Sequence, residues 1–123
     1  MVTLESVRAG VADALKGAGL HALDYVAEKI SPPAVLVVPG DPYLTREGAP
    51  FGHALVNLNV LVIGPKGTAQ AQADALDDLV VRAWRVLDEE YDVAEISAPG
   101  QVNLNGSSFL GAAITITSTE KVE

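Results

Sequence analysis

The residues best suited to acid–base or metal chemistry in this sequence are its two histidines, His21 and His53. Both lie near the expected starts of strands, and no third ligand accompanies them at a spacing typical of zinc sites. The sequence has no cysteine, which excludes disulfides and thiolate metal sites. It also lacks the Gly-x-Ser-x-Gly turn that presents a serine nucleophile. We therefore expect no catalytic residue, no metal and no cofactor, and a protein that is not an enzyme.

A glycine-rich segment, Gly64-Pro65-Lys66-Gly67-Thr68, lies between an expected strand and an expected helix. Loops in this position bind phosphate when their backbone amides wrap around it. The segment lacks the Gly-x-x-x-x-Gly-Lys-Ser/Thr spacing that this wrapping requires. We interpret it as a turn followed by a helix cap at Thr68.

Carboxylates are concentrated in one stretch of the chain. Between Asp74 and Glu95, eight acidic residues stand against two arginines, a net charge of −6 out of the chain's formal −8. Five of the acids gather at an expected helix end and in the strand after it: Asp88, Glu89, Glu90, Asp92 and Glu95. They lack the spacing and central glycine of a calcium loop. Acids at a helix C-terminus also oppose the helix dipole. The patch is either a solubilising surface, or it meets a basic partner or lines a passage that repels DNA.

The overall composition indicates one globular domain over residues 1–123. Apolar residues make up 49% of the sequence and aromatic residues only 5%, so aliphatic side chains must fill the core. A net charge of −8 argues against nucleic-acid binding through phosphate contacts. The apolar runs are too short to cross a membrane, and the N-terminus does not resemble a secretion signal. We expect a soluble, intracellular product that does not bind membranes.

The first half of the chain is expected to form one helix and three strands. Thr3 is a candidate cap for a helix that Gly17 and Gly19 end. The strands are expected at Leu20–Val26, Ala34–Val38 and His53–Ile63. The third strand alternates regularly, which assigns five apolar residues to one face: Ala54, Val56, Leu58, Val60 and Val62.

The breaker-rich segment from Pro39 to Gly52 is expected to be a long loop between the second and third strands. It also carries Tyr43, Leu44 and Phe51, and aromatic side chains are common interface anchors. This favours a docking role for the loop.

The second half is expected to contain one helix and two strands. Five residues of the helix form its buried stripe: Ala73, Leu76, Val80, Ala83 and Leu87. Strands are expected at Tyr91–Ala98 and Ser108–Thr119, joined by a polar loop, Pro99–Ser107, with a turn at Asn105-Gly106. Trp84 and Phe109 are expected in the core. The fold class is therefore α+β, in the order helix, three strands, helix, two strands, with the helices packed on a mixed or antiparallel sheet.

Several short segments follow the alanine-rich first helix in order: Ala18-Gly19-Leu20, Asp24-Tyr25-Val26, Ser31-Pro32-Pro33-Ala34 and Pro39-Gly40-Asp41-Pro42-Tyr43. A long alternating strand, a helix that holds Trp84, and a final strand with Ile114-Thr115-Ile116-Thr117 come after them. In this order the chain resembles the tail terminator proteins of long-tailed bacteriophages, particularly those of actinobacterial phages. The resemblance spans most of the chain and rests on layout and short segments, because this family has no catalytic motif.

The resemblance implies a homohexameric ring that stops tail-tube polymerisation and joins the tube to the head connector or stopper protein. It implies a virion protein of the tail and neck, assembled in the host bacterial cytoplasm, through which DNA passes without specific binding. Each subunit of a ring presents two different patches to its neighbours. We expect the loop from Pro39 to Phe51 to form one patch and the loop from Pro99 to Ser108, with Asn103 and Asn105, to form another.

Two other functions remain compatible with these features. One is a different neck component, such as a head-closure protein. The other is a small, non-enzymatic ligand-binding or regulatory domain, which a helix-covered sheet supports equally well.

Overall fold

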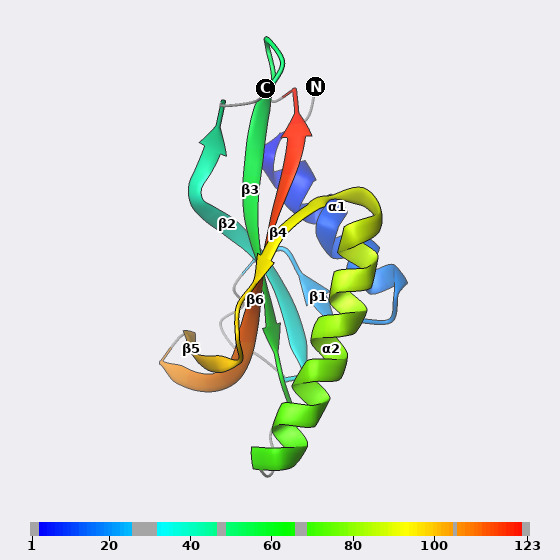
Figure 1. Ribbon diagram of the computed structural model, residues 1–123, viewed down its shortest axis with the longest axis vertical. Coiled ribbons are helices and arrows are strands. Elements are labelled where there is room, and N and C mark those ends of the chain that lie inside the picture. The colour runs from blue at the N-terminus through cyan, green and yellow to red at the C-terminus, as the bar shows by residue number, and fades with distance from the viewer. Residues whose placement is uncertain (1–2, 26–31, 47–48, 66–68, 105, 122–123) are drawn as a thin grey trace.

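The computed structural model describes residues 3–25, 32–46, 49–65, 69–104 and 106–121 (Figure 1). It contains two helices and a six-stranded mixed sheet, which confirms the α+β class. The elements are α1 (Leu4–Gly17), β1 (Ala22–Leu23), β2 (Ala34–Thr45), β3 (Ala54–Ile63), α2 (Ala69–Glu90), β4 (Asp92–Ile96), β5 (Gly100–Leu104) and β6 (Ser107–Glu120). The elements follow the expected order, except that three strands come after α2 and two were expected.

The strands lie in the order β1-β2-β3-β6-β4, and β5 also pairs with β6. Among the described strands, β1 and β2 pair in parallel and the other pairs are antiparallel. On one side of β6 lies β3; on the other side, β4 and β5 follow each other as one interrupted strand. Ser97 continues the pairing between them, because its N–H donates to the Ala113 carbonyl at 2.8 Å and its Oγ accepts from the Ala113 N–H at 2.9 Å. The β4–β5 segment is therefore one outer edge of the sheet.

Both helices pack on the same face of the sheet and share one core. The helix α1 begins with a capping box, in which the Thr3 hydroxyl accepts from the Ser6 N–H at 3.1 Å. The predicted alternation of β3 is confirmed: Val56, Leu58, Val60 and Val62 are fully buried in this core. From the predicted stripe of α2, the core takes Leu76, Ala83 and Leu87 as buried members. Thr68, the expected cap of α2, lies outside the described residues.

Neither of the described helices lies on the opposite face of the sheet, which is polar over part of its length. The Thr115 hydroxyl donates to Asn59 Oδ1 at 3.2 Å, and the Thr117 hydroxyl donates to Asn57 Oδ1 at 3.1 Å. These cross-strand pairs satisfy side-chain groups that alternate with the buried residues of β3 and β6. The predicted polar face of β3 is confirmed in this region.

The predicted loop over Pro39–Gly52 is wrong in its first half, because β2 continues to Thr45. The proline and glycine residues are accommodated by a shift in register between Pro39 and Leu44. Asn57 holds the irregular segment in place: its Nδ2 donates to the Pro42 carbonyl at 3.0 Å. Prolines and bulges are tolerated here because this part of β2 lies at the edge of the sheet. The proline and glycine residues of this segment therefore belong to a bulged edge strand and not to a loop.

Three other expectations differ from the structure. The first strand covers only Ala22–Leu23, and the loop expected over Pro99–Ser107 instead contains β5. Trp84 is 38% exposed, so its expected place in the core is wrong. It follows the buried Ala83 by one position, which is about 100° around an α-helix and places it beside the buried stripe. Phe109 is partly buried.

Candidate functional site

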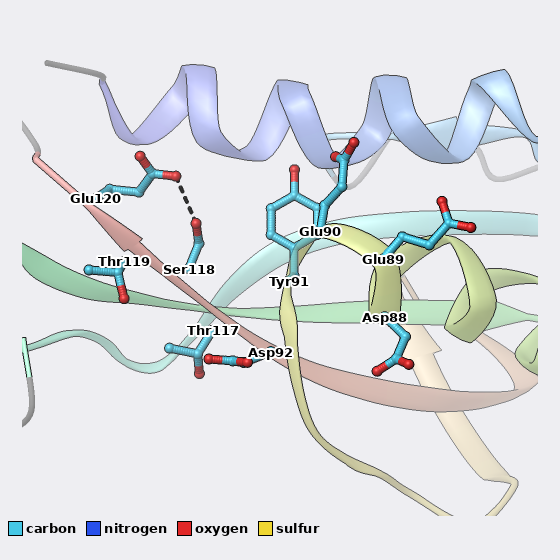
Figure 2. A pocket seen from close by; sticks show the side chains of 9 residues that line it. All are labelled: Asp88, Glu89, Glu90, Tyr91, Asp92, Thr117, Ser118, Thr119 and Glu120. Atoms are coloured by element: carbon cyan, nitrogen blue, oxygen red, sulfur yellow. Dashed lines mark hydrogen bonds between the residues drawn. The ribbon is translucent and has the colours of Figure 1, made fainter.

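An open cleft of about 560 Å³ lies where α2 ends and β4 begins (Figure 2). Its lining comes from two separate segments of the chain. One segment runs from the C-terminal turn of α2 to the first residue of β4, and the other is the end of β6. The lining residues are Asp88, Glu89, Glu90, Tyr91, Asp92, Thr117, Ser118, Thr119 and Glu120. We call this feature the acidic cleft.

The acidic cleft exists because β6 extends beyond β4. Pairing between the two strands begins at Asp92, which lies opposite Thr117. The next three residues of β6, 118–120, pair with β3 on their other side. No described strand pairs with them on the side of β4. The chain enters β4 directly from α2 (Figure 1), so it leaves a short unpaired length of β6 beside the helix end.

Five carboxylates line the acidic cleft. Four belong to the predicted patch, namely Asp88, Glu89, Glu90 and Asp92, and the fifth is Glu120. Sequence reasoning missed Glu120, because only the pairing of β4 with β6 brings it to the helix end. No basic residue lies in the last turn of α2. The helix dipole disfavours Asp88, Glu89 and Glu90 at this end of α2, and no basic residue there offsets their charge in the isolated chain. Such a local conflict is typical of a functional surface.

Tyr91 forms the wall of the acidic cleft next to α1. Its ring packs against the core, and Figure 2 shows it pointing toward α1 between Glu90 and Glu120. A Cβ added at Gly10 would lie 4.0 Å from the Tyr91 hydroxyl, so the helix passes close to it. Burial raises the pKa of Tyr91 above its ordinary value of 10.0, and the charges of Glu90 and Glu120 raise it further. The negative charges of Glu90 and Glu120 therefore disfavour ionisation of the Tyr91 phenol.

The raised pKa of Tyr91 predicts a loss of stability at alkaline pH. The folded state holds the phenolic proton more tightly than the unfolded state does, so this contribution is present below pH 10 and is lost as pH rises through the raised pKa. In chemical denaturation between about pH 9 and about pH 11, wild type should lose more stability than Tyr91→Phe. The Glu120→Gln variant should shift the tyrosinate absorbance transition of Tyr91 to lower pH. Equal alkaline losses in wild type and Tyr91→Phe would contradict this assignment.

A second groove, of about 440 Å³, lies on the helix-free face of the sheet. Glu95 lines it together with Asp41, so the structure separates Glu95 from the other four acids of the predicted patch. Asn57, Asn59, Thr115 and Thr117 also line this groove. Their side chains already bond to one another across the strands, which reduces their capacity to hold a ligand.

The predicted assembly contacts are distributed over both ends of the sheet. Phe51 is 98% exposed and Leu44, in β2, is 42% exposed. Tyr43 is half-buried and packs against the core. Asn103, in β5, accepts hydrogen bonds through Oδ1 from the Ser108 hydroxyl at 2.7 Å and from Gln101 Nε2 at 3.1 Å. Asn105 lies outside the described residues. Of these residues, Phe51 and Leu44 present the largest free apolar surface.

The two histidines stay apart from the acidic cleft. His21 is exposed and precedes β1, and the His53 ring contacts the Phe51 carbonyl at 3.2 Å. Among the described residues, no three His, Cys, Asp or Glu side chains are arranged to hold a metal ion. Within the same part of the chain, neither helix has a stretch long and apolar enough to cross a bilayer.

Comparison with known proteins found no matching family model and no matching curated protein.

Proposed function

We propose that this chain is a structural subunit that assembles with copies of itself into a ring at the head-proximal end of a phage tail tube. There it ends tube polymerisation and joins the tube to the head connector. The resemblance of the sequence to tail terminator proteins identifies the kind of assembly, and the exposure of apolar side chains at both outer edges of the sheet supports self-association. Leu44 on β2 is 42% exposed, and Ile96 on β4 is 40% exposed.

The two edges are chemically different, which is what a closed ring requires. A ring forms when one patch of a subunit contacts a different patch of the next. The edge of β2 is bulged and carries Leu44, with the exposed Phe51 in the following turn. The opposite edge is the β4–β5 segment, with Ile96 exposed and a polar hairpin at its end. Pairing unlike edges favours head-to-tail association over a two-fold dimer.

The charge of the chain suits a ring around DNA. Its formal net charge is −8, and five carboxylates gather in the acidic cleft. Carboxylates repel the phosphate backbone, so a lumen that carries them would let DNA pass without binding it. The same charges would also attract a basic partner.

A ligand-binding domain is the second candidate, and the helix-free groove favours it. That groove has the size of a small-molecule site. A monomeric chain whose thermal stability rises with a small molecule would support this function over ring assembly. A head-closure protein would share the exposed edges and the connector as a partner. It would differ in leaving tube length unchanged.

Replacing Phe51 by alanine should weaken assembly without affecting the fold. The side chain is 98% exposed, so its removal should change the free energy of unfolding by less than about 0.5 kcal/mol. Light scattering and electron-microscope images, with and without tail tube protein, should show fewer rings than for wild type. The double variant that also replaces Tyr43 is less informative, because Tyr43 packs against the core. Unchanged ring formation by Phe51→Ala would count against this contact.

A further inference from the structure

We infer that the acidic cleft receives an extended, lysine- or arginine-bearing segment of a partner protein, which adds to β6 as a strand beside residues 118–120. This inference rests on the proposed function in identifying the partner as a neighbouring component of the tail or neck. The mode of binding rests on the geometry of the acidic cleft alone.

The edge of β6 beside the acidic cleft is unpaired over residues 118–120 in the described part of the chain. In an antiparallel sheet, successive residues direct their N–H and C=O groups to opposite sides of the strand. At least one of the residues 118–120 therefore directs both groups away from β3 and toward the acidic cleft. Binding by strand addition uses such free backbone groups at a sheet edge. The acidic cleft is open and contains this edge along its wall.

Carboxylates lie on both sides of that edge. Figure 2 shows Glu90 and Glu120 directed toward α1, whereas Asp88 and Asp92 point to the opposite side. A strand added here would direct alternate side chains to these two sides. The added strand would meet carboxylates on both sides. The described lining contains no basic side chain. Charge complementarity therefore selects a basic segment.

The described strands of the chain itself contain no lysine or arginine. Its lysines and arginines number eight and are widely spaced. The closest pair, Arg82 and Arg85, belongs to the helix α2 and is not extended. The described strands of a second copy therefore offer no basic segment, and we assign the occupant to a different protein.

Peptide binding to the whole chain of 123 residues tests the inference. The probes are fluorescent peptides of about ten residues that alternate valine with lysine, or valine with glutamate. A third probe is the lysine peptide with alternate backbone nitrogens methylated, which keeps its charge but removes hydrogen-bond donors. At about 50 mM salt, the lysine peptide should bind, and the other two should bind about tenfold more weakly by fluorescence anisotropy.

Charge-reversal variants locate the binding. The double variant Asp92→Lys, Glu120→Lys should weaken binding of the lysine peptide about tenfold. The matched control Asp74→Lys, Asp77→Lys makes the same change in net charge on exposed positions of α2 outside the acidic cleft. It should leave the affinity within about twofold. Equal weakening by both double variants, or equal affinity for the methylated peptide, would overturn strand addition in favour of general charge attraction.

Light scattering of the same samples separates this inference from the proposed function. A protein that forms rings but does not bind the lysine peptide would overturn the inference alone. A chain that binds the peptide yet remains solitary beside tail components would overturn the ring and leave the mode of binding intact. Loss of self-association in Asp92→Lys, Glu120→Lys without any peptide present would assign the acidic cleft to a second copy instead.

Discussion

Replacing Asp88, Glu89 and Glu90 together by lysine is expected to stabilise the folded chain and to abolish docking of its partner. These acids occupy the last turn of α2, where the helix dipole favours positive charge. Their reversal should raise the free energy of unfolding by about 1 kcal/mol at low salt. It also removes three of the five carboxylates in the acidic cleft. Denaturation at low and high salt measures the first effect, and co-sedimentation with tail tube or connector protein measures the second.

The matched control for this variant is the triple replacement of Asp74, Asp77 and Asp78 by lysine. It changes the net charge equally and lies on the same helix, but outside both the last turn and the acidic cleft. We expect it to bind the partner normally. If the variant in the last turn is stabilised and still docks and supports infection as wild type does, the acidic patch serves only solubility.

The Gly111→Ala variant is expected to lose about 2 kcal/mol of stability, because it places a methyl group where the sheet leaves no space. A Cβ at this position would lie 2.8 Å from the Val62 carbonyl oxygen and 3.0 Å from Val102 Cγ2. The first of these atoms belongs to the backbone of β3 and cannot move without disturbing the β3–β6 pairing. Guanidinium denaturation should show a lower midpoint with an unchanged slope.

Gly17→Ala is the control for Gly111→Ala. Gly17 is the last residue of α1, and a Cβ added there would meet nothing within 4 Å. Alanine favours a helix over glycine, so this variant should be stabilised by about 0.5 kcal/mol. Loss of stability at both positions would indicate a general intolerance of added methyl groups. A loss below about 0.5 kcal/mol in Gly111→Ala would show that the backbone of β3 leaves room for a methyl group at this position.

The interior of the fold was predictable wherever a local period repeats over many residues. The alternation in β3 identified Val56, Leu58, Val60 and Val62 as one buried face. The helical spacing in α2 identified Leu76, Ala83 and Leu87. These predictions succeeded because a period of two or of 3.6 residues assigns side chains to faces before any tertiary contact forms. Trp84 was predicted to be buried because it is a large apolar residue, but its position on α2 lies beside the buried stripe.

The edge of the sheet was less predictable, because the same residues form either loops or irregular strands. Pro39, Gly40 and Pro42 predicted a loop, yet they lie in a bulged part of β2 that Asn57 holds from the neighbouring strand. The turn expected near Gly106 was compatible with either a loop or a hairpin. Pairing with Ser107–Gly111 of β6 made β5 a strand.

The amino-acid sequence alone determined the α+β class, the buried faces and four of the five carboxylates of the acidic cleft, because each depends on residues close together in the chain. The tertiary structure added Glu120 to the acidic cleft and moved Glu95 to the helix-free groove. Both outcomes depend on how β4 aligns with β6. That alignment joins residues far apart in sequence and also leaves residues 118–120 unpaired beside the helix, which no local pattern specifies.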